Sequence, residues 1–159
     1  MLTLHDLAPV LDVALAAEGL KDPELPISVL VATGWTEWQP ESTGMTEERS
    51  WRHAGPPDEG SSGGYAWTTA SQGGGVILGL IVEAPSHAAA RALHGAIRDR
   101  ITSERRLLDV ESDSTWSNWS DGHRTVRLAL HEGSNEPGKS IPPTVQLSFE
   151  PADTGEQEG

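Results

Sequence analysis

The chain has 159 residues, which is enough for one domain with a substantial buried core. Its formal net charge is −13, which argues against specific nucleic-acid binding, because affinity for phosphate depends on Lys and Arg displacing counterions. The chain has no cysteine, which excludes disulfides and thiolate metal sites.

Apolar residues make up 36% of the chain, which also holds 17 glycines and 11 prolines. This composition predicts a modest core with long loops rather than full disorder. No apolar stretch approaches the roughly 20 residues that span a membrane. No basic region precedes an apolar run at the N-terminus, so no signal peptide is expected.

The first predicted element is a helix in DLAPVLDVALAAEGL (residues 6–20). Its apolar residues recur at helical spacing at Leu7, Leu11, Ala14 and Leu15. Asp6 is the predicted N-cap, because it places Pro9 in the first turn, where the missing N–H costs no hydrogen bond. A start at Thr3 would place Pro9 deeper in the helix. Gly19 is the predicted C-cap.

The next run, ISVLVATGW (residues 27–35), is rich in β-branched residues and almost continuously apolar, which predicts a central strand. Gly34 near its end predicts a bulge or a sheet edge. Residues 41–64 are polar and rich in glycine, and they predict a long mobile loop. A loop of this length in a compact domain often contacts a partner.

Two further strands are predicted in YAWTTAS (residues 65–71) and VILGLIVEA (residues 76–84). The short Gly-rich link QGGG between them indicates a β-hairpin. The alternative is a phosphate-binding loop, which needs a helix directly after the glycines, whereas a strand follows here. The hairpin is therefore the favoured interpretation.

A second helix is predicted over residues 86–101, with Ser86 as its N-cap. Its apolar stripe, which is suited to packing on a sheet, consists of Ala89, Ala90, Leu93, Ala96, Ile97 and Ile101. Alternating apolar residues then predict strands around residues 126–130 and 142–150.

This order of elements predicts an α+β fold with a mainly antiparallel sheet, two helices packed on one face, and long loops. We expect a single domain over residues 1–150. The acidic, polar residues 151–159 are expected to form a frayed C-terminal tail.

No catalytic, cofactor-binding or metal-binding constellation is found in the sequence. His87 and His94 lie two turns apart on the second predicted helix, but neither has a His partner at i+4 or the nearby carboxylates of a zinc helix. Both are predicted to occupy surface or cap positions. Ser86 lacks the flanking glycines of a nucleophile elbow. We therefore expect no enzyme activity and no cofactor.

The chain has six tryptophans against one tyrosine and one phenylalanine. One interpretation is that they fill the core of a small domain. The other is that at least two of them act at an interface, where Trp and Tyr are often binding hot spots. The candidate interface residues are Trp67, Tyr65, Trp51 and Trp38, and the hairpin is predicted to offer an open sheet edge beside them.

Over about residues 5–131, the predicted order of elements resembles the tail terminator (tail completion) proteins of long-tailed phages. The resemblance is carried by DLAPVLDVALAAEGL, by PISVLVA and by VILGLIVEAPSHAAARALHGAIRDRI. The Trp-rich TWSNWSDG and the loop at residues 41–64 depart from the family's pattern.

The resemblance implies a virion protein of the tail, made in the host cytoplasm. It implies a homo-oligomeric ring, usually hexameric, that ends polymerisation of the tail tube protein and joins the tube to the head-side connector protein. Such a ring needs no cofactor and no membrane. DNA passes through its lumen without binding, and the net charge of −13 is compatible with that.

Two alternatives stay open. The first is a small acidic interaction module of the immunity or inhibitor type, which would bind a basic protein partner. The second is an enzyme whose active site the sequence does not reveal.

Overall fold

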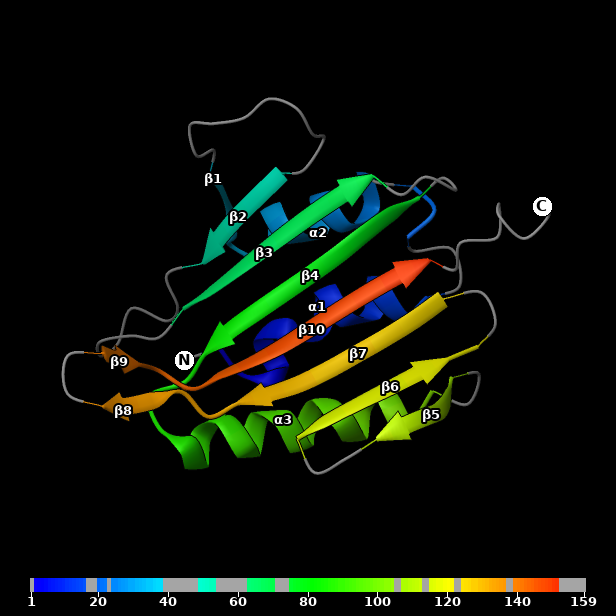
Figure 1. Ribbon diagram of the computed structural model, residues 1–159. Coiled ribbons are helices and arrows are strands. Elements are labelled where there is room, and N and C mark those ends of the chain that lie inside the picture. The colour runs from blue at the N-terminus through cyan, green and yellow to red at the C-terminus, as the bar shows by residue number, and fades with distance from the viewer. Residues whose placement is uncertain are drawn as a thin grey trace.

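An eight-stranded antiparallel sheet, with three helices on one of its faces, makes up the described part of the chain (Figure 1). The computed structural model describes residues 2–16, 20–22, 24–38, 49–53, 63–70, 75–104, 107–112, 115–121, 124–136 and 139–151. The expectations for most of the loop at residues 41–64 and for the C-terminal tail lie outside these ranges. The predicted C-cap at Gly19 is wrong, because the first helix ends at Leu15 with Ala16 as its C-cap. The predicted α+β class with a mainly antiparallel sheet is confirmed.

The helices are α1 (Leu4–Leu15), α2 (Glu24–Ala32) and α3 (His87–Thr102). The strands of the large sheet are β1 (Thr36–Trp38), β2 (Arg49–His53), β3 (Gly64–Ala70), β4 (Val76–Glu83), β5 (Leu108–Ser112), β6 (Trp116–Ser120), β7 (Arg124–His131) and β10 (Thr144–Pro151). Their order in the sheet is β1-β2-β3-β4-β10-β7-β6-β5. The short hairpin of β8 (Ser134–Glu136) and β9 (Lys139–Ile141) interrupts the connection from β7 to β10.

The N-terminus of α1 differs from the prediction, because Thr3 and not Asp6 is the N-cap. The backbone N–H of Asp6 donates to Thr3 Oγ1 (3.3 Å), and the backbone N–H of Thr3 donates to Asp6 Oδ2 (2.9 Å). This capping box satisfies two backbone donors at once, which favours the earlier start although it places Pro9 inside the helix.

The predicted central strand at residues 27–35 is wrong, since most of this run forms α2. Asp22 Oδ1 accepts a hydrogen bond from the N–H of Glu24 (3.0 Å) at the start of the helix. At its end Gly34 has φ of +98°, and the N–H of Trp35 donates to the carbonyl of Leu30 (2.9 Å). Gly34 therefore closes a helix in a Schellman motif and does not mark a bulge. The sheet consequently carries three described helices instead of the predicted two.

A strand also lies inside the segment predicted to be loop. β2 pairs with β3 through Trp51 and Ala66, and it pairs with β1 on its other side. Trp51 faces the helices and is only 2% exposed, which explains why this short segment is held in the sheet. The hairpin of β3 and β4 forms as predicted, but its predicted open edge is wrong. β2 covers β3, and β10 covers β4.

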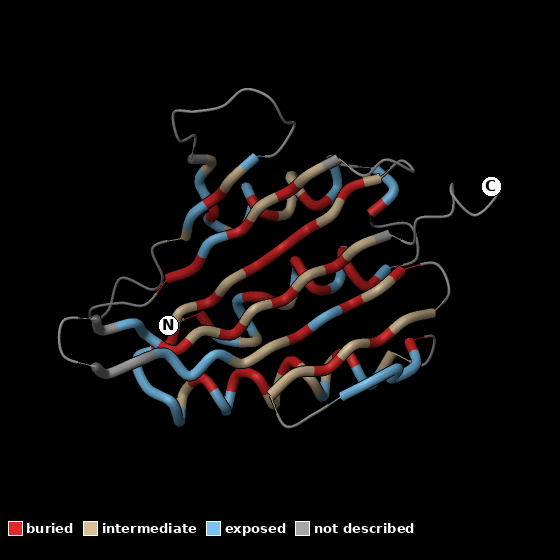
Figure 2. The backbone as a smooth tube through the Cα atoms, viewed as in Figure 1, coloured by how far each residue is buried: buried red, intermediate tan, exposed pale blue. Residues whose placement is uncertain are grey.

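The core lies between the sheet and the helices. On each central strand every second residue is buried beneath a helix, for example Leu78, Leu80 and Val82 on β4 (Figure 2). Ser86 caps α3 as predicted, with its Oγ accepting from the N–H of Ala89 (3.1 Å).

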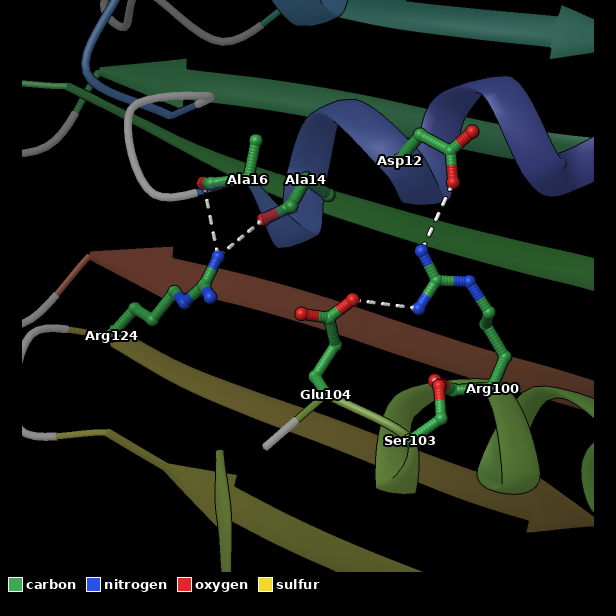
Figure 3. Close-up of polar contacts among 7 residues, drawn as sticks. All are labelled: Asp12, Ala14, Ala16, Arg100, Ser103, Glu104 and Arg124. Carbon is green, nitrogen blue, oxygen red and sulfur yellow. Dashed lines mark hydrogen bonds and ion pairs between the residues drawn. The ribbon is translucent and has the colours of Figure 1, made fainter. Parts of the chain in front are cut away.

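Two arginines tie α1 to the rest of the fold (Figure 3). The buried Arg124 of β7 donates from Nη1 to the carbonyl oxygens of Ala14 (3.2 Å) and Ala16 (3.0 Å) at the end of α1. Arg100 of α3 donates to the carboxylates of Asp12 (3.0 Å) and Glu104 (2.9 Å).

None of the described helices is both long enough and apolar enough to cross a membrane.

Candidate functional site

The face of the sheet that points away from the helices, here called the open face, is not covered by any described helix, and Figure 1 looks onto it. An antiparallel sheet with one solvated face normally carries polar side chains there. In this protein the outward positions of the central strands include several apolar and aromatic residues. They are Tyr65, Trp67, Ile77, Ile81, Trp116 and Ala129.

The strand register lines up six of these outward positions in one row across the sheet, here called the cross-sheet row. From β2 to β6 it consists of Arg52, Tyr65, Ile81, Gln146, Ala129 and Trp116, each opposite the next. Four of the six side chains are apolar or aromatic. At a strand spacing of about 4.8 Å, the part from Tyr65 to Trp116 spans about 19 Å. The row thus brings the exposed Tyr65 and the half-buried Ile81, Ala129 and Trp116 into one line, with Gln146 between Ile81 and Ala129.

One end of the row is formed by Arg52 and Tyr65. Tyr65 is 37% exposed, and the Arg52 guanidinium carbon lies 5.5 Å from the centre of its ring. A cation over an aromatic ring holds both side chains in place while leaving their polar ends in solvent. This end can offer an apolar ring, a hydroxyl and a positive charge to a partner.

A second row runs beside the first, and Trp67 is its largest side chain. Trp67 lies opposite Gly79, and its indole occupies the space that a Cβ at Gly79 would need. The absence of a side chain at Gly79 therefore allows the ring to lie against the neighbouring strand. Trp67 is half-buried, because its ring lies against the sheet, and its remaining surface is part of the open face.

Two of the four predicted interface residues, Tyr65 and Trp67, lie on the open face. Trp51 does not, because it is buried on the helix side, where the Arg49 guanidinium carbon lies 5.2 Å from the centre of its ring. The prediction for Trp51 is therefore corrected to a core role. Trp38 is paired with Ser50 at the edge of the sheet, and the surroundings of its side chain lie outside the described part of the structure.

Trp116 and Ile81, which were not predicted as interface residues, belong to the same surface. The signal for Trp116 was present in TWSNWSDG, where Trp116 and Trp119 are three residues apart and so point to opposite faces of a strand. Trp119 is accordingly buried, and Trp116 faces outward. Trp35 is buried as well, so the core interpretation applies to three of the tryptophans and the open face holds two.

The prediction of a surface position for His94 is wrong, because this residue is 5% exposed. Burial lowers the pKa of His94, and the nearby positive charge of Arg98 lowers it further. Its Nε2 has no hydrogen-bond partner among the described residues. His87 is exposed, with Nδ1 at 3.7 Å from the carboxylate of Glu132. The described residues contain no group of three His, Asp or Glu side chains that could hold a metal ion.

On the helix side an apolar groove of about 300 Å³ lies between the start of α1 and α3. It is lined by Leu2, Thr3, Leu4, Ala89, Ala92, Leu93 and Ala96. Ala89 and Ala96 of the predicted apolar stripe line this groove, and Ala89 also packs against the core.

No protein-family model matches the chain, and no curated protein or solved structure is similar enough to count as a match.

Proposed function

We propose that this protein acts by binding another protein through the open face of its sheet. The observation that carries the proposal is the cross-sheet row, in which Tyr65, Ile81, Ala129 and Trp116 occupy outward positions. Apolar and aromatic side chains gathered on a face that no described helix covers are typical of a protein-binding surface. Tyr and Trp contribute strongly at such surfaces because they bury a large area with little loss of side-chain freedom.

A narrower proposal, from the sequence resemblance, is a ring that ends the tail tube of a long-tailed phage and joins it to the head-side connector. Its support comes from the β4–α3 unit, which lies close to its predicted place, and from α1, a helix in the predicted region that begins and ends earlier than predicted. The segment PISVLVA, which also carries the resemblance, is helical instead. A ring subunit needs two different contact surfaces. With the hairpin edge covered, the sheet edges β1 and β5 take its place as the second surface beside the open face.

The acidic interaction module is the second candidate role, and the net charge of −13 favours it. A strongly acidic protein attracts a basic partner over a distance of about one Debye length, roughly 8 Å at physiological salt. Both roles use protein–protein contact, so the same surface test applies to both.

The test compares two sets of substitutions that remove apolar side chains from different faces. One variant carries Tyr65→Ser, Ile81→Thr and Trp116→Gln on the open face. The matched control carries Leu25→Ser and Val31→Thr on α2, where both residues are exposed. The wild type and both variants are tagged and expressed in the organism from which the protein comes. The proteins that co-purify with each of them are then quantified.

We expect the open-face variant to lose a stoichiometric partner that the wild type and the control retain. Retention of the same partner by all three proteins would contradict the proposal.

The ring is tested separately by native mass measurement. An assembly whose mass is a fixed whole-number multiple of the monomer mass, formed alone or with the tube protein, supports the ring. A protein that stays monomeric in both conditions contradicts it.

A further inference from the structure

The strand β5 forms one edge of the sheet and has no neighbour beyond it among the described strands. All five of its residues are exposed. Leu108 and Val110 are exposed to 67% and 65%, which is unusual for large aliphatic side chains on a regular strand. An edge strand presents unpaired backbone N–H and C=O groups that a further strand can pair with. β5 therefore combines free backbone groups with apolar side chains.

We propose that β5 binds an extended segment of a different protein, which carries both apolar and basic side chains, as a ninth strand of the sheet. Its apolar side chains match Leu108 and Val110. Its basic side chains match Asp109 and Glu111, which are exposed on the same strand. Asp109 lies opposite Trp119 and Glu111 opposite Asn118, so the two carboxylates lie on different faces of the sheet. Backbone pairing supplies affinity in this mode of recognition, and the side chains supply specificity.

A second copy of this chain fits the edge poorly. β5 itself contains no Lys or Arg, so a second copy would bring two further carboxylates beside Asp109 and Glu111. Like charges directly opposite each other destabilise a strand pair. Parallel pairing in register would place each carboxylate opposite its own equivalent. The charges on β5 thus disfavour self-association through this edge and favour a basic strand.

The described part of this chain does not offer such a strand either. Arg residues alternate with other side chains in β2 (RSWRH) and in the first half of β7 (RTVRLALH). Both strands are already paired on each side, β2 with β1 and β3, and β7 with β10 and β6. The occupant is therefore a segment of another protein.

The register shift in the β5–β6 pairing, between Asp109 and Glu111, makes the edge selective. A bulge bends and twists an edge strand and makes indiscriminate strand addition harder. A partner strand must therefore gain from specific side-chain pairs as well as from backbone hydrogen bonds. The acidic pair beside Val110 supplies those contacts.

The experiment uses a fluorescent peptide, acetyl-Lys-Val-Val-Arg-Val-Val-Lys-amide, and measures its anisotropy with the full-length protein at physiological salt. Its basic residues are three apart, so they fall on both faces of a strand. A second peptide has Glu at every basic position. A third keeps the basic sequence but is N-methylated at alternate residues, which blocks backbone pairing on one edge without changing the charge. The protein variants are Asp109→Lys/Glu111→Lys and a control with equal charge change on other elements, Asp99→Lys/Glu132→Lys.

We expect the wild type and the control to bind the basic peptide and not the acidic one. N-methylation and the β5 charge reversal should each weaken binding by on the order of tenfold, and the reversal should create binding of the acidic peptide. Amide hydrogen exchange should slow in residues 108–112 when the basic peptide is bound.

Equal binding of the basic and the N-methylated peptide would overturn the proposal, because it would show attraction to net charge alone. Equal loss in the control variant, or no binding of the basic peptide by the wild type, would overturn it too. The open-face variant should bind the peptide normally. Failure at β5 and failure at the open face are therefore distinguishable.

Discussion

Trp67 lies against Gly79 on the open face, and a side chain at position 79 would occupy the place of the indole ring. We expect Gly79→Ala to displace the ring and to lower the free energy of unfolding by about 1–3 kcal/mol, as overpacking does elsewhere. Urea denaturation measures the loss. In the Trp67→Ala background the same substitution should cost much less. Simple additivity of the two effects would show that the contact does not restrain the indole.

The buried guanidinium of Arg124 fixes the end of α1 to the sheet (Figure 3). Arg124→Met leaves two carbonyl oxygens without their donor and leaves the Asp121 carboxylate without its 3.1 Å ion pair. We expect a loss of about 3 kcal/mol in the free energy of unfolding. Arg127→Met on the same strand removes an exposed guanidinium and should cost less than about 0.5 kcal/mol. Equal losses in the two variants would contradict the assignment of Arg124 as an anchor.

The capping box at the start of α1 predicts a loss of about 1 kcal/mol for Thr3→Ala and much less for Thr3→Ser. Hydrogen bonds from Thr3 lower the pKa of Asp6. The stabilisation from Asp6 is thus present above the ordinary carboxyl pKa and disappears as the pH falls through the lower value in the folded protein. Thermal unfolding of wild type and Asp6→Asn should therefore converge at acidic pH. A difference between them that does not change with pH would contradict this.

Burial lowers the pKa of His94, so the neutral imidazole is the form that the folded protein favours. Below the ordinary value of 6.5 the unfolded chain binds a proton that the folded chain resists, and stability falls as the pH drops. The loss ends below the folded-state pKa. We expect His94→Leu to flatten the decline in urea midpoint between about pH 7 and pH 5.5. His87→Leu, at an exposed position, is the control, and an equal flattening by both substitutions would contradict the prediction.

Elements with a single consistent local signal were predictable from the sequence. β4 is an apolar run with a Gly-rich turn before it, and α3 has an N-cap and a regular stripe, so both lie close to their predicted places. In residues 24–35 two signals conflict. The β-branched residues favour a strand, whereas Asp22, Gly34 and Trp35 form the ends of a helix, and the end contacts prevail. Propensity alone does not contain those contacts.

Two of the six apolar or aromatic residues on the open face were predictable for a similar reason. Tyr65 and Trp67 belong to a recognisable hairpin, and their alternation places them on one face. Their neighbours Ile81 and Trp116 join them only through the register of five strands, including the late insertion of β10 between β4 and β7. Trp51 was misplaced because β2 is short and is held by long-range packing, which leaves no local pattern.

The most direct test of the central claim is site-specific photocrosslinking in the source of the protein. A photoreactive phenylalanine analogue replaces Tyr65 or Trp116 on the open face, or Val31 on α2 as the control, where the native side chain is 58% exposed. We predict one discrete adduct of the same mass from Tyr65 and Trp116, and none from Val31. An adduct from Val31, with none from either open-face position, would contradict the proposal that the open face is the binding surface.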